Sequence, residues 1–219
     1  MNNNLNVSGV QPNLFLDCES IGKEVVKENY SMPDAEITFY PNFFNKIKSD
    51  VMFENLFKEI KWRSDKIKLY GKEFDLPRKT AWYGEQEKSY KYSGIEMFPE
   101  PWTPTLLEIK QEIEKVSDTK FNSVMMNLYR DGNDGISWHT DAEPELGRNP
   151  TIASVSFGQT RRFMLRHRNN KELKFEIELT HGSLLLMGGP TQHFWQHQIP
   201  KTSRKLKPRI NLTFRVIIN

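Results

Sequence analysis

The pattern of hydrophobic and polar positions divides the chain near residue 120. Before that point, residues 45–62 and residues 104–116 carry apolar side chains at helical spacing. The second stretch begins at a proline and keeps Glu and Lys off its apolar stripe, so it predicts an amphipathic helix. Residues 67–71 alternate and end at a glycine, which predicts the edge of a hairpin.

After residue 120, short alternating runs follow one another with Gly, Asn, Asp and Pro between them. Short strands at such close spacing predict a sandwich or jelly roll. Residues 1–33 are polar and weakly patterned, and we expect a leader or flexible arm there. The expected strands of the later part are residues 124–129, 152–157, 162–166, 173–179, 183–187, 194–198 and 209–217.

The last of these strands alternates between polar and apolar residues from Arg209 to Arg215. Asn211 and Thr213 would share one face with the two arginines, because alternate side chains of a strand point to the same side. A strand with one solvated face would show the same pattern. However, guanidinium groups bind carboxylates through paired hydrogen bonds, so this row also suits a small dianion. In a regular strand the two arginines lie about 20 Å apart and would address opposite ends of an extended ligand.

Three side chains that precede this strand could bind one metal ion. His139 and Asp141 are two residues apart, so extended backbone would point both to one side, whereas His197 would come from another strand. Two imidazoles and one carboxylate leave coordination positions open, as in non-haem Fe(II) oxygenases. For His-x-Asp alone a solvated turn is the alternative, and His193 competes with His197 as a ligand.

The composition of the 219 residues fits a soluble globular protein, with 37% hydrophobic and 27% charged side chains. The formal net charge of +3 is too small to predict a nucleic-acid partner by itself. Cys18 is the single cysteine, which excludes an intramolecular disulfide and favours a reducing compartment. We expect no signal peptide, because the first residues lack a basic start and an apolar run, and no apolar run approaches the roughly 20 residues of a membrane span. We therefore expect a soluble intracellular protein without membrane attachment.

A series of motifs runs from about residue 37 to the C-terminus, and it includes His-x-Asp with a distal His and the ending Arg-x-Asn-x-Thr-x-Arg. The series resembles the AlkB family of Fe(II)/2-oxoglutarate dioxygenases and is most similar to its nucleic-acid repair branch. Many oxygenases share the first motif, whereas the ending is more particular to this family. The matching segments, in the family's order, are residues 77–79, 83–84, 92–94, 127–129, 139–143, 154–158, 181–187 and 208–215.

This resemblance implies a mainly β fold in which an α/β extension, residues 34–119, precedes a double-stranded β-helix (jelly roll), residues 120–219. The extension would cap the active site with a nucleotide-recognition lid and a finger hairpin, and the two parts would form one integrated domain. The resemblance also implies that His139, Asp141 and His197 bind Fe(II), with 2-oxoglutarate and O2 as cosubstrates. The implied contacts of 2-oxoglutarate are Asn127, Tyr129, Arg209, Asn211, Thr213 and Arg215.

The resemblance further implies a demethylase of N-alkylated bases, of the 1-methyladenine and 3-methylcytosine type, that releases formaldehyde and repairs alkylation damage in DNA and RNA. Glu143 would approach the exocyclic amine, and the base would stack between His139 and either Trp82 or Tyr83. Tyr83 and Ser93 would belong to the lid, and Tyr70 stands at the finger tip where the family has Phe. The implied nucleic-acid contacts are Arg78, Trp82, Tyr83, Tyr92, Ser93, Glu143 and Tyr70.

Two other functions stay open. One is hydroxylation of a protein or small-molecule substrate on the same iron scaffold, and the other is a non-catalytic binding module. We expect a monomer, in the cytoplasm if the chain is bacterial and in the nucleus if it is eukaryotic. Two basic groups would suit phosphate, although solvated loops show the same composition. They are Arg161, Arg162, Arg166 and Arg168, and Lys201, Arg204, Lys205 and Lys207.

Overall fold

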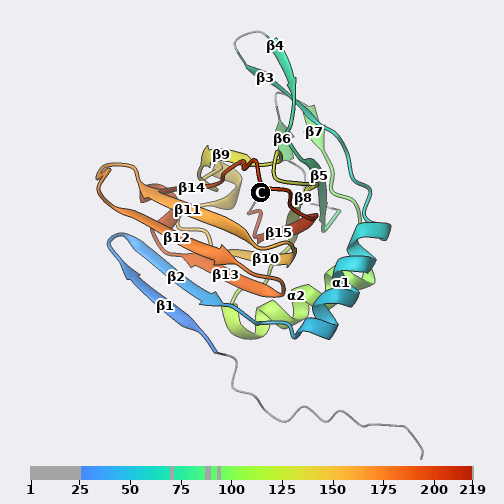
Figure 1. Ribbon diagram of the computed structural model, residues 1–219, viewed down its shortest axis with the longest axis horizontal. Helices are drawn as coiled ribbons and strands as arrows, with labels where there is room; N and C mark the ends of the chain where they lie inside the picture. The colour runs from blue at the N-terminus through green and yellow to red at the C-terminus, as the bar shows by residue number, and fades with distance from the viewer. Residues whose placement is uncertain (1–25, 70–71, 87–89, 93–94, 219) are drawn as a thin grey trace, which may run out of the picture.

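Antiparallel strands form the larger of two facing sheets in the computed structural model (Figure 1), which describes residues 26–69, 72–86, 90–92 and 95–218. The order across this sheet is β1 (Glu28–Met32), β2 (Ala35–Tyr40), β13 (Ser183–Gly188), β10 (Ile152–Gly158), β15 (Arg209–Arg215), β8 (Ser123–Tyr129) and β5 (Lys79–Gly84). The smaller sheet contains β12 (Lys174–Leu179), β11 (Arg161–His167), β14 (Trp195–Ile199) and β9 (Ile136–His139), in that order.

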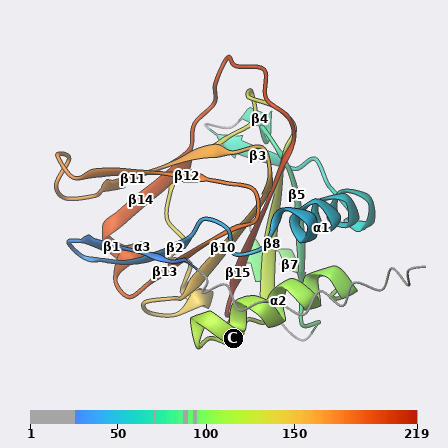
Figure 2. The ribbon, with the colours of Figure 1, turned by 60° about the horizontal axis from the view of Figure 1, so that its bottom comes forward.

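From β8 onward the chain passes back and forth between the two sheets. Strands β8, β10, β13 and β15 belong to the larger sheet, whereas β9, β11, β12 and β14 belong to the smaller one. Figure 2 shows the two sheets as separate layers that face each other. This winding is a double-stranded β-helix, and it confirms the predicted fold class.

Two hairpins lie outside these sheets: β3 (Lys66–Leu69) with β4 (Lys72–Asp75), and β6 (Tyr90–Tyr92) with β7 (Ile95–Met97). The β3–β4 hairpin projects from the body of the molecule (Figure 1). It falls where the alternating stretch predicted a hairpin, but its tip, with Tyr70, lies outside the described residues.

Helices α1 (Lys46–Glu59) and α2 (Pro104–Ser117) lie on the outer face of the larger sheet. Asn45 caps α1 by accepting a hydrogen bond from Lys48 N, and Thr103 caps α2 by accepting one from Leu106 N. Both helices were expected at these places. Shorter helical turns are α3 (Thr191–Phe194) and a 3-10 turn at Pro144–Leu146. None of the helices in the described part of the chain has the length and apolar character that a membrane span needs.

The larger sheet separates two hydrophobic cores. On its outer face, Ile210, Leu212 and Phe214 of β15 pack in the core that also holds Leu56 of α1 and Ile109 of α2. On its inner face a second core joins it to the smaller sheet. Because β15 alternates strictly, its polar residues all face inward, toward the space between the sheets.

One expectation for the N-terminal part was wrong. Residues 28–32 were expected to be part of a loose leader, but they form β1 and pair with β2 at the sheet edge. The two helices cover the face of the larger sheet that lies away from its polar residues. In α1, the apolar residues Val51 and Phe57 are exposed, whereas Ser49, Met52 and Leu56 are buried.

Candidate metal and cosubstrate site

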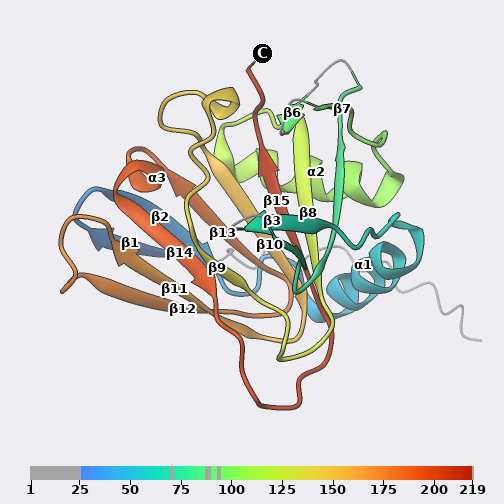
Figure 3. The same cartoon turned by 90° about the horizontal axis from the view of Figure 1, so that it is seen from above.

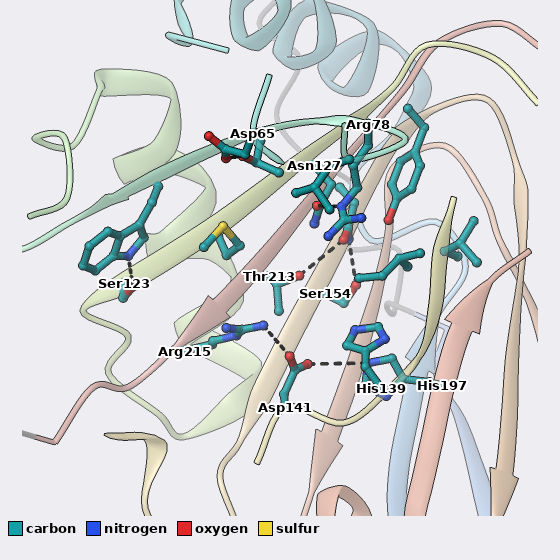
Figure 4. A pocket seen from close by; sticks show the side chains of 18 of the residues that line it. Asp65, Arg78, Ser123, Asn127, His139, Asp141, Ser154, His197, Thr213 and Arg215 are labelled. Atoms are coloured by element: carbon teal, nitrogen blue, oxygen red, sulfur yellow. Dashed lines mark hydrogen bonds and ion pairs between the residues drawn. The ribbon is translucent and has the colours of Figure 1, made fainter. Parts of the chain in front are cut away.

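Three metal-ligating side chains meet where β9 and β14 lie next to each other. His139 ends β9 and lies directly opposite His197 of β14 in the antiparallel register. Asp141 follows His139 by two residues, as the spacing predicted. Their ligand atoms all lie within 4.8 Å of one another, and Figure 4 shows the three side chains grouped together. Two imidazoles and one carboxylate at this spacing fit a divalent transition metal with open coordination positions.

Burial and neighbouring charges prepare His197 and Asp141 to bind a metal ion at neutral pH. Burial of His197 lowers its pKa to about 3, so its imidazole is neutral and free to act as a ligand. Burial by itself would raise the pKa of Asp141, but Arg215 and the two imidazoles outweigh it, and the pKa is lowered. Nδ1 of His139 lies 2.8 Å from Ser137 O, a contact that favours a proton on Nδ1 and leaves Nε2 for a metal.

Two further side chains hold Asp141 in place. Nη2 of Arg215 donates a hydrogen bond to Asp141 Oδ1. Gln192 of α3, which is fully buried, accepts a hydrogen bond from Asp141 N at 2.9 Å. Asp141 is therefore held at its carboxylate by a strand and at its backbone by a short helix, and such supporting contacts are usual for metal ligands.

Arg209 occupies the other end of β15 and has a different environment. It is 1% exposed, donates to Ser156 Oγ at 2.9 Å, and its guanidinium lies 5.1 Å from the ring centre of Tyr129. Burial lowers the pKa of Arg209 to about 10. Its Nε and Nη1 are buried and hydrogen-bond to none of the described residues. Unpaired buried donors are costly, so they suit an anionic ligand that accepts two hydrogen bonds.

The strands beside Arg209 add neutral polar groups in register. Tyr129 and Asn127 of β8 lie directly opposite Arg209 and Asn211 of β15. Asn211 donates to Ser154 Oγ at 2.9 Å, and Thr213 donates to Asn211 Oδ1 at 3.3 Å. All six residues predicted to contact the cosubstrate therefore line one cavity of about 360 Å³.

Near Arg209, Arg161 connects the loop between β8 and β9 to the loop between β14 and β15. It is 4% exposed, and its guanidinium lies 5.6 Å from the Tyr129 ring centre. It donates to three backbone oxygens, those of Asp131, Asp134 and Pro200, at 2.7–3.2 Å. The two loops approach closely at Gly132, where a Cβ would lie 2.5 Å from the carbonyl oxygen of Arg204.

The side of the cavity nearest the hairpin comes from β5. Arg78, just before the strand, donates to Asn127 Oδ1 at 2.6 Å. Thr80 and Trp82 follow at alternate positions, and Trp82 Nε1 donates to Ser123 Oγ at 2.7 Å. All three side chains line the cavity that contains the metal triad, and so does Glu143.

The prediction for Tyr83 was wrong. Tyr83 is 3% exposed in the outer core, and its hydroxyl accepts a hydrogen bond from Lys61 N. Neighbouring residues of a strand face opposite sides, so only Trp82 of this pair reaches the cavity. Ser93 lies outside the described residues, as does the side chain of Tyr92, which is in β6.

The remaining histidines and basic residues of the motifs lie outside the metal triad. His193 ends up in α3 rather than beside His197, so the triad does not include it. Nδ1 of His181 accepts from Gly158 N at 2.8 Å. Arg161 is buried, as described above, and Arg162 pairs with Glu176. The second basic group is exposed. It lies in the loop between β14 and β15 and consists of Lys201, Arg204, Lys205 and Lys207.

Comparison with known proteins assigns the chain to a family. A sequence model of the 2OG-Fe(II) oxygenase superfamily matches residues 36–215. The chain is 41% identical over 208 residues to alpha-ketoglutarate-dependent dioxygenase alkB homolog 3 of Bos taurus, covering 90% of this chain and 72% of that protein. The chain belongs to the AlkB family of 2-oxoglutarate- and Fe(II)-dependent oxygenases.

Other AlkB proteins agree with this assignment. The chain is 38% identical over 189 residues to DNA oxidative demethylase ALKBH2 of Homo sapiens, covering 82% of this chain and 72% of that protein. Its fold is similar to the solved structure of OsALKBH1, with a TM-score of 0.59, 14% identity, and coverage of 85% of this chain and 98% of that one. The chain thus spans about three quarters of the length of the two relatives in sequence.

As an AlkB-family dioxygenase the protein uses Fe(II), 2-oxoglutarate and O2. Its residues fit these groups. The triad offers two neutral nitrogens and one ionised carboxylate to the metal. Arg209 offers two unpaired buried donors to a carboxylate.

Four residues of the site did not follow from the sequence. Arg161 was grouped with surface cations, although it is buried, and Gln192 carried no motif. Asp65 and Thr80 both line the cavity, and the Thr80 hydroxyl donates to Asp65 Oδ2. Alternation along β5 with Trp82 could have found Thr80, whereas Asp65 has no local signal.

Proposed function

We propose that this protein oxidatively removes methyl groups from N-alkylated bases of the 1-methyladenine and 3-methylcytosine type. The substrates are DNA and RNA, the released product is formaldehyde, and the role is repair of alkylation damage. One observation carries the proposal: the metal triad, the arginines of β15, Trp82 and Glu143 all line a single cavity. The similarity to a protein named DNA oxidative demethylase supports it.

At the metal end, His139, Asp141 and His197 hold Fe(II). The bound metal supplies the oxidising chemistry with O2 and 2-oxoglutarate. Arg209 binds a carboxylate of 2-oxoglutarate through its free Nε and Nη1, while Tyr129 and Asn127 contact the cosubstrate from the neighbouring strand. Arg215 orients Asp141 and remains close to the metal end.

At the substrate end, the target base stacks against Trp82, with His139 on its other side. Trp82 is fixed by its hydrogen bond to Ser123, so the pocket is rigid on that side. Glu143 faces the exocyclic amine, and its Oε2 hydrogen-bonds to none of the described residues. The reaction replaces one C–H of the N-methyl group by C–OH, and the N-hydroxymethyl group then breaks its C–N bond and leaves as formaldehyde.

The surface beside the cavity fits a phosphate backbone. The loop between β14 and β15, with its exposed lysines and Arg204, extends beyond the ends of the strands (Figure 2). Figure 3 shows β3 of the β3–β4 hairpin in front of β15 and β8 of the larger sheet. Binding through such cations weakens strongly as the salt concentration rises.

The test is turnover on defined oligonucleotides. The protein is loaded without oxygen with Fe(II) and 2-oxoglutarate, then mixed with oxygen and a panel of methylated DNA and RNA oligonucleotides. Intact mass spectra should show loss of one methyl group, with one formaldehyde per base repaired. If no oligonucleotide in the panel loses a methyl group, the proposal is wrong and hydroxylation of a protein or small molecule becomes the better reading.

A matched pair of variants tests the assignment of the pocket. Trp82→Ala should strongly reduce demethylation, because it removes the stacking surface. Tyr83→Phe should leave demethylation nearly unchanged, because the Tyr83 hydroxyl lies in the outer core, where it accepts a hydrogen bond from Lys61 N. Equal losses in the two variants would contradict the placement of the base.

A further inference from the structure

Three carboxylates line the cavity: Asp65, Asp141 and Glu143. Arg215 serves two of them, because its Nη2 bonds to Asp141 and its Nη1 lies 3.7 Å from Glu143 Oε1. Asp65 has no ion-pair partner among the residues that the structure describes, and its contact is the neutral hydroxyl of Thr80. Asp65 lies across the pocket from Asp141 and Arg215 (Figure 4).

Backbone pairing places Asp65 on the cavity side. Arg63 and Thr80 form an antiparallel bridge, with both N–O distances at 2.9 Å. Directly opposite residues of such a pair share a face, so Asp65, two residues after Arg63, lies on the same face as Thr80. Leu76 N donates to Asp65 O at 2.8 Å and fixes the backbone at the root of the hairpin.

Three cations, Arg63, Lys66 and Arg78, also line the cavity, and none of them forms an ion pair with Asp65. Lys66 is exposed and lies 3.6 Å from Glu73 of the same hairpin. Arg63 is exposed and screened by solvent. Arg78 donates its Nε to Asn127. Asp65 is therefore a carboxylate at the cavity wall without an ion-pair partner among the described residues.

We propose that Asp65 makes the pocket selective for bases that carry a positive charge, an inference that rests on the proposed function. A methyl group on N1 of adenine or N3 of cytosine makes the ring cationic, whereas one on N1 of guanine or N3 of thymine leaves it neutral. A carboxylate in a partly desolvated pocket attracts the first pair and not the second. Demethylation removes the positive charge, so the same carboxylate holds the substrate but not the product.

The decisive variant is Asp65→Asn, with Asp75→Asn as its control. Asparagine keeps an oxygen that can accept from the Thr80 hydroxyl, so the fold of the hairpin root is retained. Asp75 is exposed on the same hairpin and does not line the cavity, so its substitution removes an equal charge outside the pocket. Four oligonucleotides serve as probes, with 1-methyladenine, 3-methylcytosine, 1-methylguanine or 3-methylthymine at one position.

We expect the ratio of kcat/KM for the cationic over the neutral lesions to fall about tenfold in Asp65→Asn, as expected for loss of one partly screened charge pair. The change should lie in KM, with kcat at saturating substrate retained. In Asp75→Asn the ratio should stay at the wild-type value. Affinity for the unmethylated product should change equally in the two variants.

A ratio that is unchanged in Asp65→Asn, or that falls equally in both variants, overturns the inference. The same ratio is also measured as binding affinity with 2-oxoglutarate present and oxygen excluded. A wild-type protein that demethylates no oligonucleotide refutes the proposed function, and the binding ratio then still decides on Asp65. A wild-type protein that binds both lesion classes equally well refutes the role of Asp65 alone.

Discussion

The two ends of β15 carry the same residue type in opposite surroundings. Arg215 already pairs with a carboxylate of the protein, Asp141, and lies near a second one. Arg209, six residues away on the same face, lies beside a serine hydroxyl and an aromatic ring and forms no ion pair with any described residue. The neighbours rather than the residue type therefore decide the role. Arg215 is paired with a predicted metal ligand, whereas Arg209 has two buried donors that bond to none of the described residues.

The difference has an electrostatic consequence. Burial lowers the pKa of Arg209 to about 10, which means that its charge is poorly solvated. An anion that enters this end of the pocket relieves that cost and gains charge-assisted hydrogen bonds. At the other end, the positive charge of Arg215 lowers the pKa of Asp141. Variants at the two ends should therefore affect different ligands.

Removal of a metal ligand should have the largest effect. In Asp141→Ala the metal loses its anionic ligand and Arg215 loses its partner. We expect a loss of turnover of more than about a thousandfold, with Fe(II) affinity reduced as well, because breaking a buried ion pair adds to the loss of the ligand. His139→Ala should behave alike. Fe(II) binding and 2-oxoglutarate decarboxylation are the measurements, and substantial surviving turnover would mean that the metal lies elsewhere.

Truncation of Arg209 should come next. In Arg209→Met the half-saturating concentration of 2-oxoglutarate should rise about a hundredfold, because two charge-assisted hydrogen bonds are lost. Fe(II) affinity measured without 2-oxoglutarate should stay near the wild-type value. Steady-state titrations of the cosubstrate check the first point, and metal titrations check the second. Ser156→Ala, which removes only the hydroxyl beside Arg209, is the milder control.

The same change at the other end should give the reverse result. In Arg215→Met we expect Fe(II) affinity to fall about tenfold, in the range seen when a residue that orients a metal ligand is lost. At saturating Fe(II), the half-saturating concentration of 2-oxoglutarate should change little. If Arg209→Met and Arg215→Met shift both constants equally, the two ends do not have separate roles.

The smallest effect is expected where an arginine acts on neither ligand directly. Arg161→Lys keeps the charge but cannot reach three carbonyl oxygens at once, so we expect a loss of about 1–2 kcal/mol in the free energy of unfolding. Denaturant titration measures this loss. The half-saturating concentration of 2-oxoglutarate should rise only a few-fold, through Tyr129. A rise as large as that of Arg209→Met would show that Arg161 contacts the cosubstrate.

The sequence predicted those parts of the site that follow from local periodicity. The alternation along β15 determined which residues share a face, and the spacing of His139 and Asp141 determined that they act together. Trp82 and Tyr83 could not be told apart in this way, because both are aromatic and either face of β5 can be the inner one. The burial of Tyr83 against α1 and α2 became visible only when the helices were placed.

Arg161 and Gln192 were not predicted because their partners are backbone groups far away in the sequence. Arg161 reaches carbonyl groups in two loops, and Gln192 reaches the amide of Asp141, 51 positions away in the chain. Nothing beside these residues in the sequence indicates such partners. Likewise, the polar composition of residues 28–32 gave no sign of β1, since an edge strand is fixed by its pairing with β2 rather than by its own pattern.

Because His139 pairs directly with His197, the spacing between β9 and β14 sets the distance between these two metal ligands. The distance between the two imidazoles depends on a backbone ladder and not on the length of any loop. Insertions in the turn between β11 and β12, at residues 168–173, should therefore be harmless, so this turn is a natural place for a fluorophore or an affinity tag. A single inserted residue inside β14 would instead rotate His197 to the other face of the sheet and remove it from the site.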